Sequence, residues 1–376
     1  MIKHRGEVES VNYFSEIYCG RRVLVTGHTG FKGSWLTLWL KHLGAEVAGY
    51  SLDVPEPPSN FDILGLEGRL RHYRGDIRDR VRLAEVIDEF RPEMIFHLAA
   101  QALVRRSYAD PVTTFETNTM GMVNLLECAR TRPWIETAVL ITSDKAYRND
   151  EWCWGYRETD ALGGHDPYSG SKSCAELVAH SYFHSFLRDT PTRVATTRAG
   201  NVIGGGDWSD DRIVPDCVRA WSKRKSVSVR SPQATRPWQH VLEPLSGYLW
   251  LGAQLWQKSE GLNGEAFNFG PDAHVNQTVA ELLSAMATSW PGAQWDVPEG
   301  CEQGGHEATL LKLSCDKVLF YLNWRAVLQF PETVAFTVDW YLAWHGSHQD
   351  IYTYTVDQIE QYCQLAQERG VPWIQL

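Results

Sequence analysis

The chain has 376 residues, of which 43% are hydrophobic and 22% charged, and its formal net charge is -10 at pH 7. These values are ordinary for a folded globular protein of about two domains, and without basic blocks they argue against nucleic acid or an anionic membrane as a partner. The eight cysteines show no C-x-x-C spacing, and no segment has the pattern of a targeting peptide or a membrane span, so we expect free thiols, no metal site and a cytoplasmic location.

The first predicted elements are a strand at residues 22–26, a glycine-rich turn and an apolar helix that contains Trp35 and Trp39. Glycines let the backbone turn sharply and approach a pyrophosphate, and the helix N-terminus offers free N–H groups and a positive dipole end. The alternative is a tight turn without a ligand, but the strand and helix on either side favour dinucleotide binding. The predicted contacts are Gly27, Thr29, Gly30, Phe31, Lys32 and Gly33.

Cofactor choice is usually set at the end of the second strand, here predicted at residues 46–50. Ser51 falls nearest the position that contacts the ribose and Asp53 follows two residues later, which favours NAD over NADP. The third strand, 70–74, is followed by Asp76 and Ile77, which we expect near the adenine. The fourth, 93–98, ends in residues that would let a cofactor lie against the backbone: Leu98, Ala99 and Ala100. Asn118, in a helix predicted at 110–130, is expected to satisfy backbone groups.

The apolar run 138–141 predicts a strand buried on both faces. Ligands of open α/β sheets bind just past the carboxyl ends of the strands. Ser143, Asp144 and Lys145, which follow Thr142 directly, should therefore lie over a crevice.

Tyr168 and Lys172 are four residues apart in a segment with helical periodicity, 168–188, which places both on one helix face. A phenol with a pKa of about 10 is a poor base at neutral pH, but a nearby ammonium lowers that pKa. The pair can therefore act as a general base for a sugar or alcohol hydroxyl. An ordinary amphipathic helix is the alternative.

A strand at 193–198 is followed by the glycine-rich segment 199–208, for which we predict no regular element. Arg212, Arg230 and Arg236 then occur in polar surroundings that suit a diphosphate, although solvated arginines are the alternative for each. Residues 265–270 predict a last strand, and 275–286 and 331–344 predict helices, the first capped by Asn276.

This alternation predicts an α/β fold with a doubly wound parallel (Rossmann) sheet and a smaller mixed α/β substrate domain. We expect residues 14–200 plus 238–271 to form the NAD-binding domain and residues 201–237 plus 272–376 to bind a nucleotide sugar.

With these motifs placed, the chain resembles the extended short-chain dehydrogenase/reductase family, and within it the nucleotide-sugar 4,6-dehydratases. The resemblance rests on the glycine turn and helix start at 26–36, the Thr-Ser-Asp-Lys run at 142–145, the Tyr168/Lys172 pair, the loop 200–208 and the segment 236–241. It continues at His306-Glu307-Ala308 and Leu311-Lys312-Leu313.

The resemblance implies a reaction with tightly held NAD. Tyr168 takes the proton of the sugar 4-hydroxyl while hydride leaves C4, water is lost across C5 and C6, and the hydride returns to C6. Lys172 would lower the pKa of Tyr168 and hold the nicotinamide ribose, Ser143 would hydrogen-bond the C4 oxygen, and Asp144 would protonate the departing 6-hydroxyl. Thr142, Tyr168 and Lys172 would also contact the cofactor, and the substrate contacts would be Gln101, Asn201, Arg212 and Arg236.

Lys145 departs from the pattern of dTDP-sugar and GDP-sugar dehydratases, which usually carry Glu there as the C5 base. Lys145 is either that base, in its neutral form, or a group that stabilises an enolate while another group takes the proton. The lysine favours the branch of the family that acts on CDP-glucose. Another nucleotide-sugar dehydratase, an epimerase and a non-catalytic dinucleotide sensor are the rival functions. The resemblance also implies a homodimer, with a tetramer left open.

Overall fold

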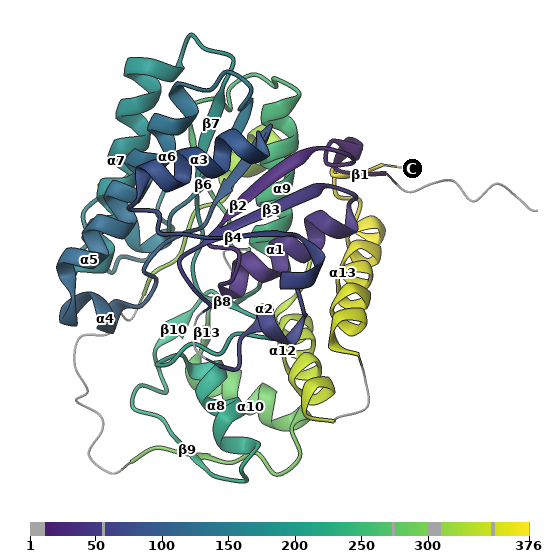
Figure 1. The fold of residues 1–376 in the computed structure, drawn as a ribbon. Coiled ribbons are helices and arrows are strands. Elements are labelled where there is room, and N and C mark those ends of the chain that lie inside the picture. Colours follow the sequence, from purple (N-terminus) through teal and green to yellow (C-terminus); the bar gives the residue numbers. More distant parts are fainter. Residues whose placement is uncertain (1–11, 55–56, 273–274, 299–309, 347–349, 376) are drawn as a thin grey trace, which may run out of the picture.

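A computed structural model describes residues 12–54, 57–272, 275–298, 310–346 and 350–375 (Figure 1). The match at His306-Glu307-Ala308 lies outside these residues. The centre of the fold is a seven-stranded sheet in the order β12-β7-β6-β5-β2-β3-β4, and every pairing in it is parallel. Its strands are β2 (Arg22–Thr26), β3 (Glu46–Ser51), β4 (Arg71–Arg74), β5 (Met94–His97), β6 (Thr137–Ile141), β7 (Arg193–Arg198) and β12 (Ala266–Asn268). The doubly wound fold is confirmed.

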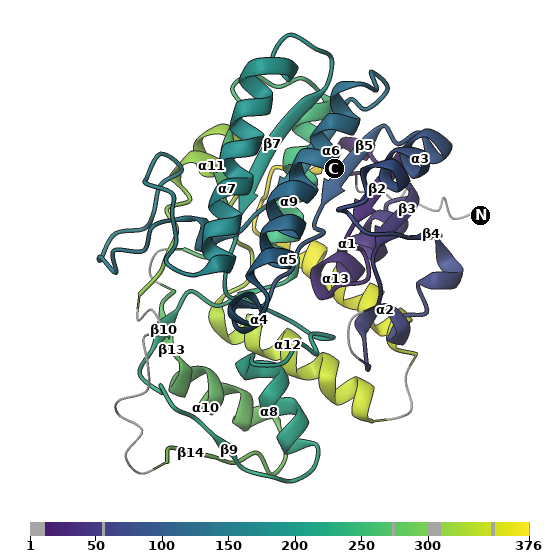
Figure 2. The ribbon, with the colours of Figure 1, turned by 60° about the vertical axis from the view of Figure 1, so that its left-hand side comes forward.

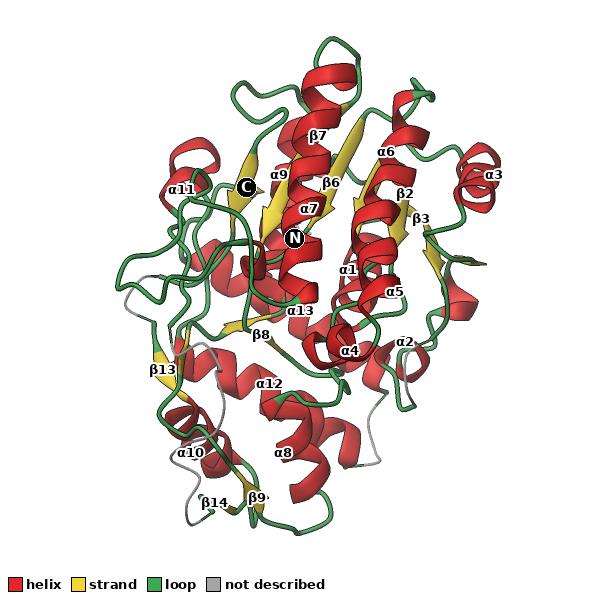
Figure 3. Ribbon diagram, turned by 90° about the vertical axis from the view of Figure 1, so that its left-hand side faces the viewer, coloured by secondary structure: helices red, strands yellow, loops and turns green. Residues whose placement is uncertain are grey.

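Helices cover both faces of this sheet, as Figures 2 and 3 show. On one face, Leu24, Ile95 and Leu140 pack against the first helical layer, and on the other face Val25, Phe96 and Val139 pack against the second. The first layer is α3 (Arg80–Phe90), α6 (Gly121–Arg130) and α7 (Pro167–Tyr182); the second is α1 (Phe31–His42) and α9 (Leu242–Trp256). Burial on both faces explains why the central strands β2, β5 and β6 are largely apolar runs.

The two long predicted helices are present, and each contains a π-helical turn. Asp110 caps α5 (Pro111–Phe115), which runs through the turn η3 (Glu116–Met120) into α6. Asp166 caps α7, which ends in the turn η5 (Phe183–Leu187). Both caps accept a hydrogen bond from a backbone N–H of the first turn, and both helices have proline at the start, where its missing N–H costs nothing.

A smaller lobe lies beside one end of the sheet and contains α8 and α10 (Figures 1 and 2). The segment 199–208, for which no regular element was predicted, contains the two-residue strand β8, and β8 pairs in parallel with β11. The lobe's elements are β8 (Val202–Ile203), α8 (Ile213–Trp221), β9 (Val227–Ser228), β10 (Thr235–Arg236), β11 (Gln239–His240), β13 (Gln277–Thr278), α10 (Val279–Ser289), β14 (Trp295–Asp296) and α12 (Phe330–His345).

The prediction that Asn276 caps a helix at 275–286 is wrong. Thr278 caps α10, because its hydroxyl accepts from the Glu281 N–H while the Glu281 carboxylate accepts from the Thr278 N–H. This reciprocal arrangement satisfies two donors at once. Gln277 and Thr278 also pair with β10, which keeps the chain extended up to the cap.

The C-terminal segment packs back onto the first half of the chain. The ring of Tyr362, on α13 (Ile351–Glu368), lies 5.8 Å from that of Trp39 on α1. Glu243, on α9, is buried and accepts hydrogen bonds from the N–H groups of Val327 and Leu328 and from the Tyr362 hydroxyl. One carboxyl group therefore holds two parts of the C-terminal segment, the loop at Val327 and Leu328 and the helix α13.

Stability should depend on pH through this carboxyl group. Burial raises the pKa of Glu243 from 4.5 to about 7, against the effect of its hydrogen bonds. The folded state therefore binds the proton more tightly than the unfolded state, which stabilises the fold below pH 4.5, and this contribution is lost as the pH rises through about 7. We expect the unfolding free energy of Glu243→Gln, relative to wild type, to rise by roughly 3 kcal/mol over that interval. Urea unfolding at several pH values measures it, and parallel profiles for the two proteins would contradict it.

Candidate active site

The glycine-rich turn has the geometry that a pyrophosphate requires. A Cβ added to Gly27 would lie 2.7 Å from the Ala99 backbone nitrogen, and one added to Gly33 would lie 2.1 Å from the Gly27 carbonyl oxygen. Helix α1 begins after Gly30, which offers no side-chain cap. The first-turn N–H groups, including those of Phe31 and Lys32, can therefore bind an anion. These features fit a dinucleotide.

At the end of β3, the Ser51 hydroxyl and His28 Nδ1 share a hydrogen bond of 2.9 Å. The histidine tautomer decides which of the two donates it. Thr29 donates its hydroxyl to the Asp53 carbonyl, and the Asp53 carboxylate pairs with Arg74 at 2.8 Å. Ser51 and Asp53, the two predicted cofactor-selecting positions, are thus both next to the glycine turn.

Asp76 and Gln101 make side-chain contacts within the protein. Both carboxylate oxygens of Asp76 accept hydrogen bonds from Arg78. The Gln101 amide donates to the Leu103 carbonyl and to Thr114 Oγ1. Asn118 bonds to both backbone groups of Gln101, which confirms its predicted architectural role.

The Ser-Asp-Lys triplet directly follows the buried strand β6, as predicted. Ser143 caps the short 3-10 turn η4 (Asp144–Ala146) and accepts a hydrogen bond from the Lys145 N–H at 3.2 Å. Its hydroxyl also donates to Asp144 Oδ1 at 2.9 Å. Ser143 and Asp144 are buried, whereas Lys145 is half-buried. The cap fixes the acid's orientation relative to the serine hydroxyl.

Tyr168 lies next to this triplet and is also buried. Burial raises the pKa of Tyr168 above its usual 10; the polar side chain of Ser143 and the charge of Arg212 oppose this, and the charge of Asp144 adds to it. This differs from the expectation that Lys172 lowers the pKa of Tyr168. Removal of the phenol from water outweighs the charges around it, because the phenolate loses its hydration.

Positive groups surround the acid and the tyrosine. Burial and the charge of Lys32 lower the pKa of Lys172 to about 8. Burial and the charge of Arg212 lower the pKa of Lys32 to about 8 as well, while Asp144 and Asp207 raise it. The Lys32 side chain, predicted as a cofactor contact, is therefore also close to the acid.

The predicted substrate arginines are held by the smaller lobe. Arg212 forms a 3.0 Å ion pair with the buried Asp207, and its charge acts on Tyr168 and Lys32. Arg236 is on β10, where it pairs with Gln277 of β13 and donates to the Thr235 carbonyl. The fold therefore places Arg212 near Tyr168 and Lys32, whereas Arg236 lies in the small β10–β13 sheet.

A buried ion pair beneath the site was not predicted. Glu176 and Arg198 are each 4% exposed and form two parallel hydrogen bonds of 2.9 Å. Thr142 and Thr196 donate their hydroxyls to the same carboxylate. Burial alone would raise the pKa of Glu176, but the charge and hydrogen bonds of Arg198 hold it below its usual range. Glu176 follows Lys172 by four residues, so the two lie on the same helix face, and this spacing could have identified Glu176 from the sequence.

Asn268, at the end of β12, joins the loops next to the acid. It accepts from the Tyr147 hydroxyl and donates to the carbonyls of Tyr156 and Ser314. Its own N–H donates to Glu158 Oε1. Sequence reasoning identified the strand but not this role.

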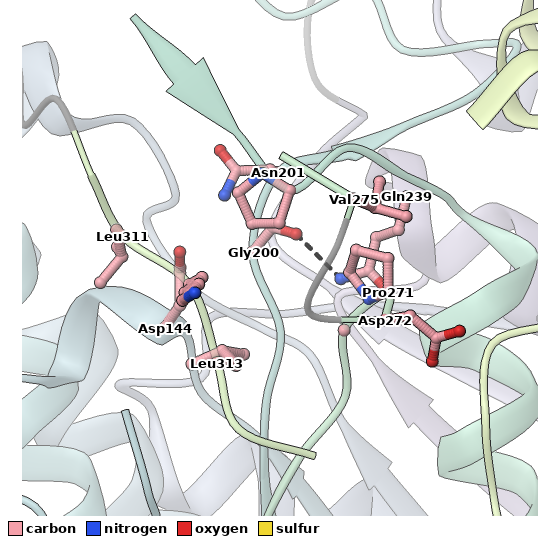
Figure 4. Close-up of a pocket in the computed structure, with 12 residues that line it drawn as sticks. Asp144, Gly200, Asn201, Gln239, Pro271, Asp272, Val275, Leu311 and Leu313 are labelled. Atoms are coloured by element: carbon pink, nitrogen blue, oxygen red, sulfur yellow. Dashed lines mark hydrogen bonds between the residues drawn. The ribbon is translucent and has the colours of Figure 1, made fainter. Parts of the chain in front are cut away.

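A pocket adjoins Asp144, as Figure 4 shows. Asn201 and Gln239 lie across it, and the Gln239 amide donates to the Gly200 carbonyl at 2.9 Å. The pocket is lined by Asp144, Gly200, Asn201, Pro237, Gln239, Gly270, Pro271, Asp272, Val275, Leu311, Lys312 and Leu313. Two motifs from the resemblance, the 200–208 loop and Leu311–Leu313, therefore meet at the acid.

Gly200 leaves room for the carboxyl group of Asp144. A Cβ at position 200 would lie 2.0 Å from Asp144 Oδ2. Gly200→Ala should therefore displace the acid and lower kcat about a hundredfold, since a shift of about 1 Å can cost that much. Gly68→Ala is the matched control because the added methyl meets nothing within 4 Å. Steady-state kinetics measures the effect, and a Gly200→Ala protein as active as the control would contradict the contact.

In the described part of the chain, no group of three or more His, Cys, Asp and Glu side chains is placed to hold a metal ion. Among the same residues, no helix combines the length and apolar character that crossing a membrane requires.

Comparison with known proteins places the chain in a family. The NAD dependent epimerase/dehydratase family matches residues 23–270, and the chain belongs to it. The chain is 48% identical to the CDP-glucose 4,6-dehydratase of Salmonella typhimurium over 331 residues, which cover 86% of this chain and 91% of that protein.

Solved structures agree. The dTDP-glucose 4,6-dehydratase of Streptomyces venezuelae, solved with NAD bound, has a TM-score of 0.70 and 25% identity over 86% of this chain and 98% of that one. The UDP-glucose 4-epimerase of Thermus thermophilus, in complex with NAD, has a TM-score of 0.69 and 26% identity over 85% and 98%. NAD is therefore the cofactor of this chain, as predicted.

Proposed function

We propose that the protein is an NAD-dependent hydro-lyase that converts CDP-glucose to CDP-4-keto-6-deoxyglucose. The observation that carries the proposal is a buried acid, Asp144, which accepts a hydrogen bond from Ser143 and whose charge acts on the buried Tyr168, in a chain 48% identical to a CDP-glucose 4,6-dehydratase. An epimerase needs the tyrosine but has no use for an acid beside it. The half-buried Lys145 completes the triplet that favours CDP-glucose.

The residues divide the reaction between them. NAD, when bound, accepts hydride from C4 of the glucose and returns it to C6. Tyr168 takes the proton of the 4-hydroxyl, and Ser143 hydrogen-bonds the C4 oxygen. The resulting ketone makes the C5 proton acidic, and Asp144 protonates the 6-hydroxyl so that it leaves as water. Arg212 and Lys172 stabilise the negative charge of the phenolate.

Lys145 is assigned to C5. In its neutral form the amine removes the C5 proton and returns it after hydride reaches C6; in its charged form the ammonium stabilises the enolate. The half-exposed position of Lys145 suits either role, because a lysine there can exchange protons with water.

The remaining assignments follow the same plan. The glycine turn binds the pyrophosphate of NAD, with Asp76 and Ile77 at the adenine and Leu98, Ala99 and Ala100 along the cofactor. Thr142 and Lys172 complete this site. Gln101, Asn201, Arg212 and Arg236 bind the nucleotide sugar. Residues 14–200 plus 238–271 form the cofactor domain and residues 201–237 plus 272–376 the substrate domain, and α13 of the latter also packs against α1.

A homodimer is part of the proposal. Large apolar side chains are exposed on the helices that carry the two π-helical turns: Val112, Phe115, Met120, Leu177 and Phe186. Because these helices are neighbours in the fold, exposed apolar side chains on them favour association. Light scattering tests the assembly and would also detect a tetramer.

The cytoplasm is the proposed location, in keeping with the seven described cysteines, which are all free thiols.

A panel of nucleotide sugars tests the function. Purified protein is incubated with CDP-, UDP-, GDP- and dTDP-glucose, and mass spectrometry follows the loss of water. We expect the 4-keto-6-deoxy product from CDP-glucose, and none from Tyr168→Phe, which lacks the base. If only another nucleotide sugar lost water, that sugar would be assigned as the substrate in place of CDP-glucose. Epimerised product would favour an epimerase, and NAD binding without any turnover a dinucleotide sensor.

A further inference from the structure

The backbone of Tyr168 is held at both of its polar groups, and the following inference rests on the proposed function, in which Tyr168 is the base. Tyr168 lies in the first turn of α7, where backbone N–H groups have no partner within the helix. Asp166 accepts hydrogen bonds from the N–H groups of Ser169 and Gly170. The Tyr168 N–H donates instead to a distant side chain, Ser107 Oγ, over 3.1 Å.

Ser107 is itself fixed in position. It lies on the short helix α4 (Val104–Ala109), is 0% exposed, and donates its hydroxyl to the Val104 carbonyl over 2.6 Å. A hydroxyl has one proton to donate and two lone pairs to accept with. Because the proton is directed at Val104, a lone pair is left to accept from the Tyr168 N–H.

The Tyr168 carbonyl is held from the other side. It accepts from the Ser171 hydroxyl over 2.7 Å, and Ser171 in turn accepts from the Asn118 amide over 2.8 Å. Asn118 also bonds to the backbone of Gln101, and the Gln101 side chain bonds to both backbone groups of Leu103, where α4 begins. The contacts therefore lead from the Tyr168 N–H through α4 and Asn118 back to the Tyr168 carbonyl.

Helix α4 also reaches the smaller lobe. Arg105, two residues before Ser107, forms an ion pair with Asp211. Asp211 directly precedes Arg212, which the proposed function assigns to the nucleotide sugar. One short helix therefore contacts both the backbone of the base and the loop that would bind the substrate.

We propose that Ser107, together with Ser171 on the carbonyl side, is a positioning residue for the proposed reaction. It holds the first turn of α7 so that the Tyr168 hydroxyl meets the 4-hydroxyl of the bound sugar. Tyr168 can take that proton only while the two oxygen atoms are within hydrogen-bond reach, roughly 3 Å. Because a displacement of about 1 Å can cost a hundredfold in rate, a loosened first turn should slow oxidation at C4.

The alternative is that these hydrogen bonds only stabilise the fold. A structural bond changes the number of folded molecules, whereas a positioning bond changes how fast each folded molecule reacts. Single-turnover kinetics separates the two, because the amplitude counts the active molecules and the rate constant describes each of them. Deuterium at C4 of the sugar then shows whether oxidation at that carbon is the step that has slowed.

In the experiment, excess protein loaded with NAD is mixed with CDP-glucose or with CDP-glucose that carries deuterium at C4, and rapid quench with mass spectrometry follows the loss of water. Wild type is compared with Ser107→Ala and Ser246→Ala. Ser246 is a matched control because it is also 0% exposed and also donates to the carbonyl three residues earlier, that of Glu243. The bonds that it accepts come from Trp324 and Tyr362, in the C-terminal segment.

We expect the rate constant of Ser107→Ala to fall about a hundredfold, and to fall severalfold further with deuterium at C4, because breaking of the C4–H bond then limits the turnover. Ser246→Ala should keep the wild-type rate constant, whatever its amplitude. A wild-type rate constant for Ser107→Ala, or a slow reaction that deuterium does not affect, would overturn the positioning role.

If Ser107→Ala does not fold, Ser171→Ala carries the test from the carbonyl side, with the same expected deuterium effect and the same contrary outcomes. Absence of product from wild type would overturn the proposed function itself. A failure of the expectation that is confined to the serine variants would overturn the positioning role and leave the proposed function standing.

Discussion

Asp144→Asn should lower kcat for loss of water from CDP-glucose about a thousandfold, within the usual range for removal of a general acid. The amide has nearly the same shape as the acid and can accept the Ser143 hydrogen bond, but it cannot protonate the 6-hydroxyl. Oxidation at C4 does not need that proton. The absorbance of the reduced cofactor should therefore build up in the variant, and stopped-flow spectroscopy with mass spectrometry measures both events.

The pocket supplies a control for this variant. Asp272 lines the same pocket but is exposed, and its carboxylate points away from Asp144 in Figure 4. Asp272→Asn removes one charge from the pocket without removing the acid, so its kcat should stay close to that of wild type. Normal turnover by Asp144→Asn would show that another group protonates the leaving hydroxyl.

Glu176→Ala should destabilise the fold by about 3–5 kcal/mol, the usual cost of breaking a buried ion pair. Arg198 would stay buried but lose its ion pair with Glu176, and the Thr142 and Thr196 hydroxyls would lose their hydrogen-bond acceptor. Urea unfolding followed by circular dichroism measures the change. Because Thr142 directly precedes Ser143, kcat should fall together with stability.

Two comparisons separate the ion pair from general effects of substitution. Glu85 pairs with Arg82 on the surface, with 59% and 41% of the two side chains exposed, and Glu85→Ala should cost less than about 1 kcal/mol. Replacing both Glu176 and Arg198 with Met should cost less than Glu176→Ala alone, since no unpaired charge remains. Equal losses for Glu176→Ala and Glu85→Ala would contradict the importance of the pair.

Local sequence was sufficient to predict the parts of the fold that depend on local rules. The glycine turn, the strand β6 and the Tyr168/Lys172 spacing are each contained in a few consecutive residues, and the parallel sheet follows from their alternation. The cap of α10 was missed because Asn276 and Thr278 are both good caps. Pairing with β10, more than forty residues earlier in the chain, and the Glu281 carboxylate decide in favour of Thr278.

The site was predictable only where its residues follow one another. Contacts between distant segments, such as that of Gly200 with Asp144, leave no local pattern in the sequence. A glycine that is needed because a side chain would not fit cannot be distinguished there from a glycine in a turn. The pKa of Tyr168 was predicted in the wrong direction for a related reason. The four-residue spacing shows that a lysine is near, but the loss of hydration depends on everything packed around the phenol.

The position of Asn268 has a consequence for the order in which the protein is made. Strands β2 to β7 are complete by Arg198, but the loops beside Asp144 are joined by a side chain seventy residues later, and that side chain also needs the Ser314 carbonyl. Since nascent chains fold from the N-terminus as they leave the ribosome, six of the seven strands of the central sheet can pair early in translation. The cleft acquires its final shape only when the last quarter of the polypeptide has emerged, so ribosome-bound chains shorter than this carry a sheet but no working enzyme.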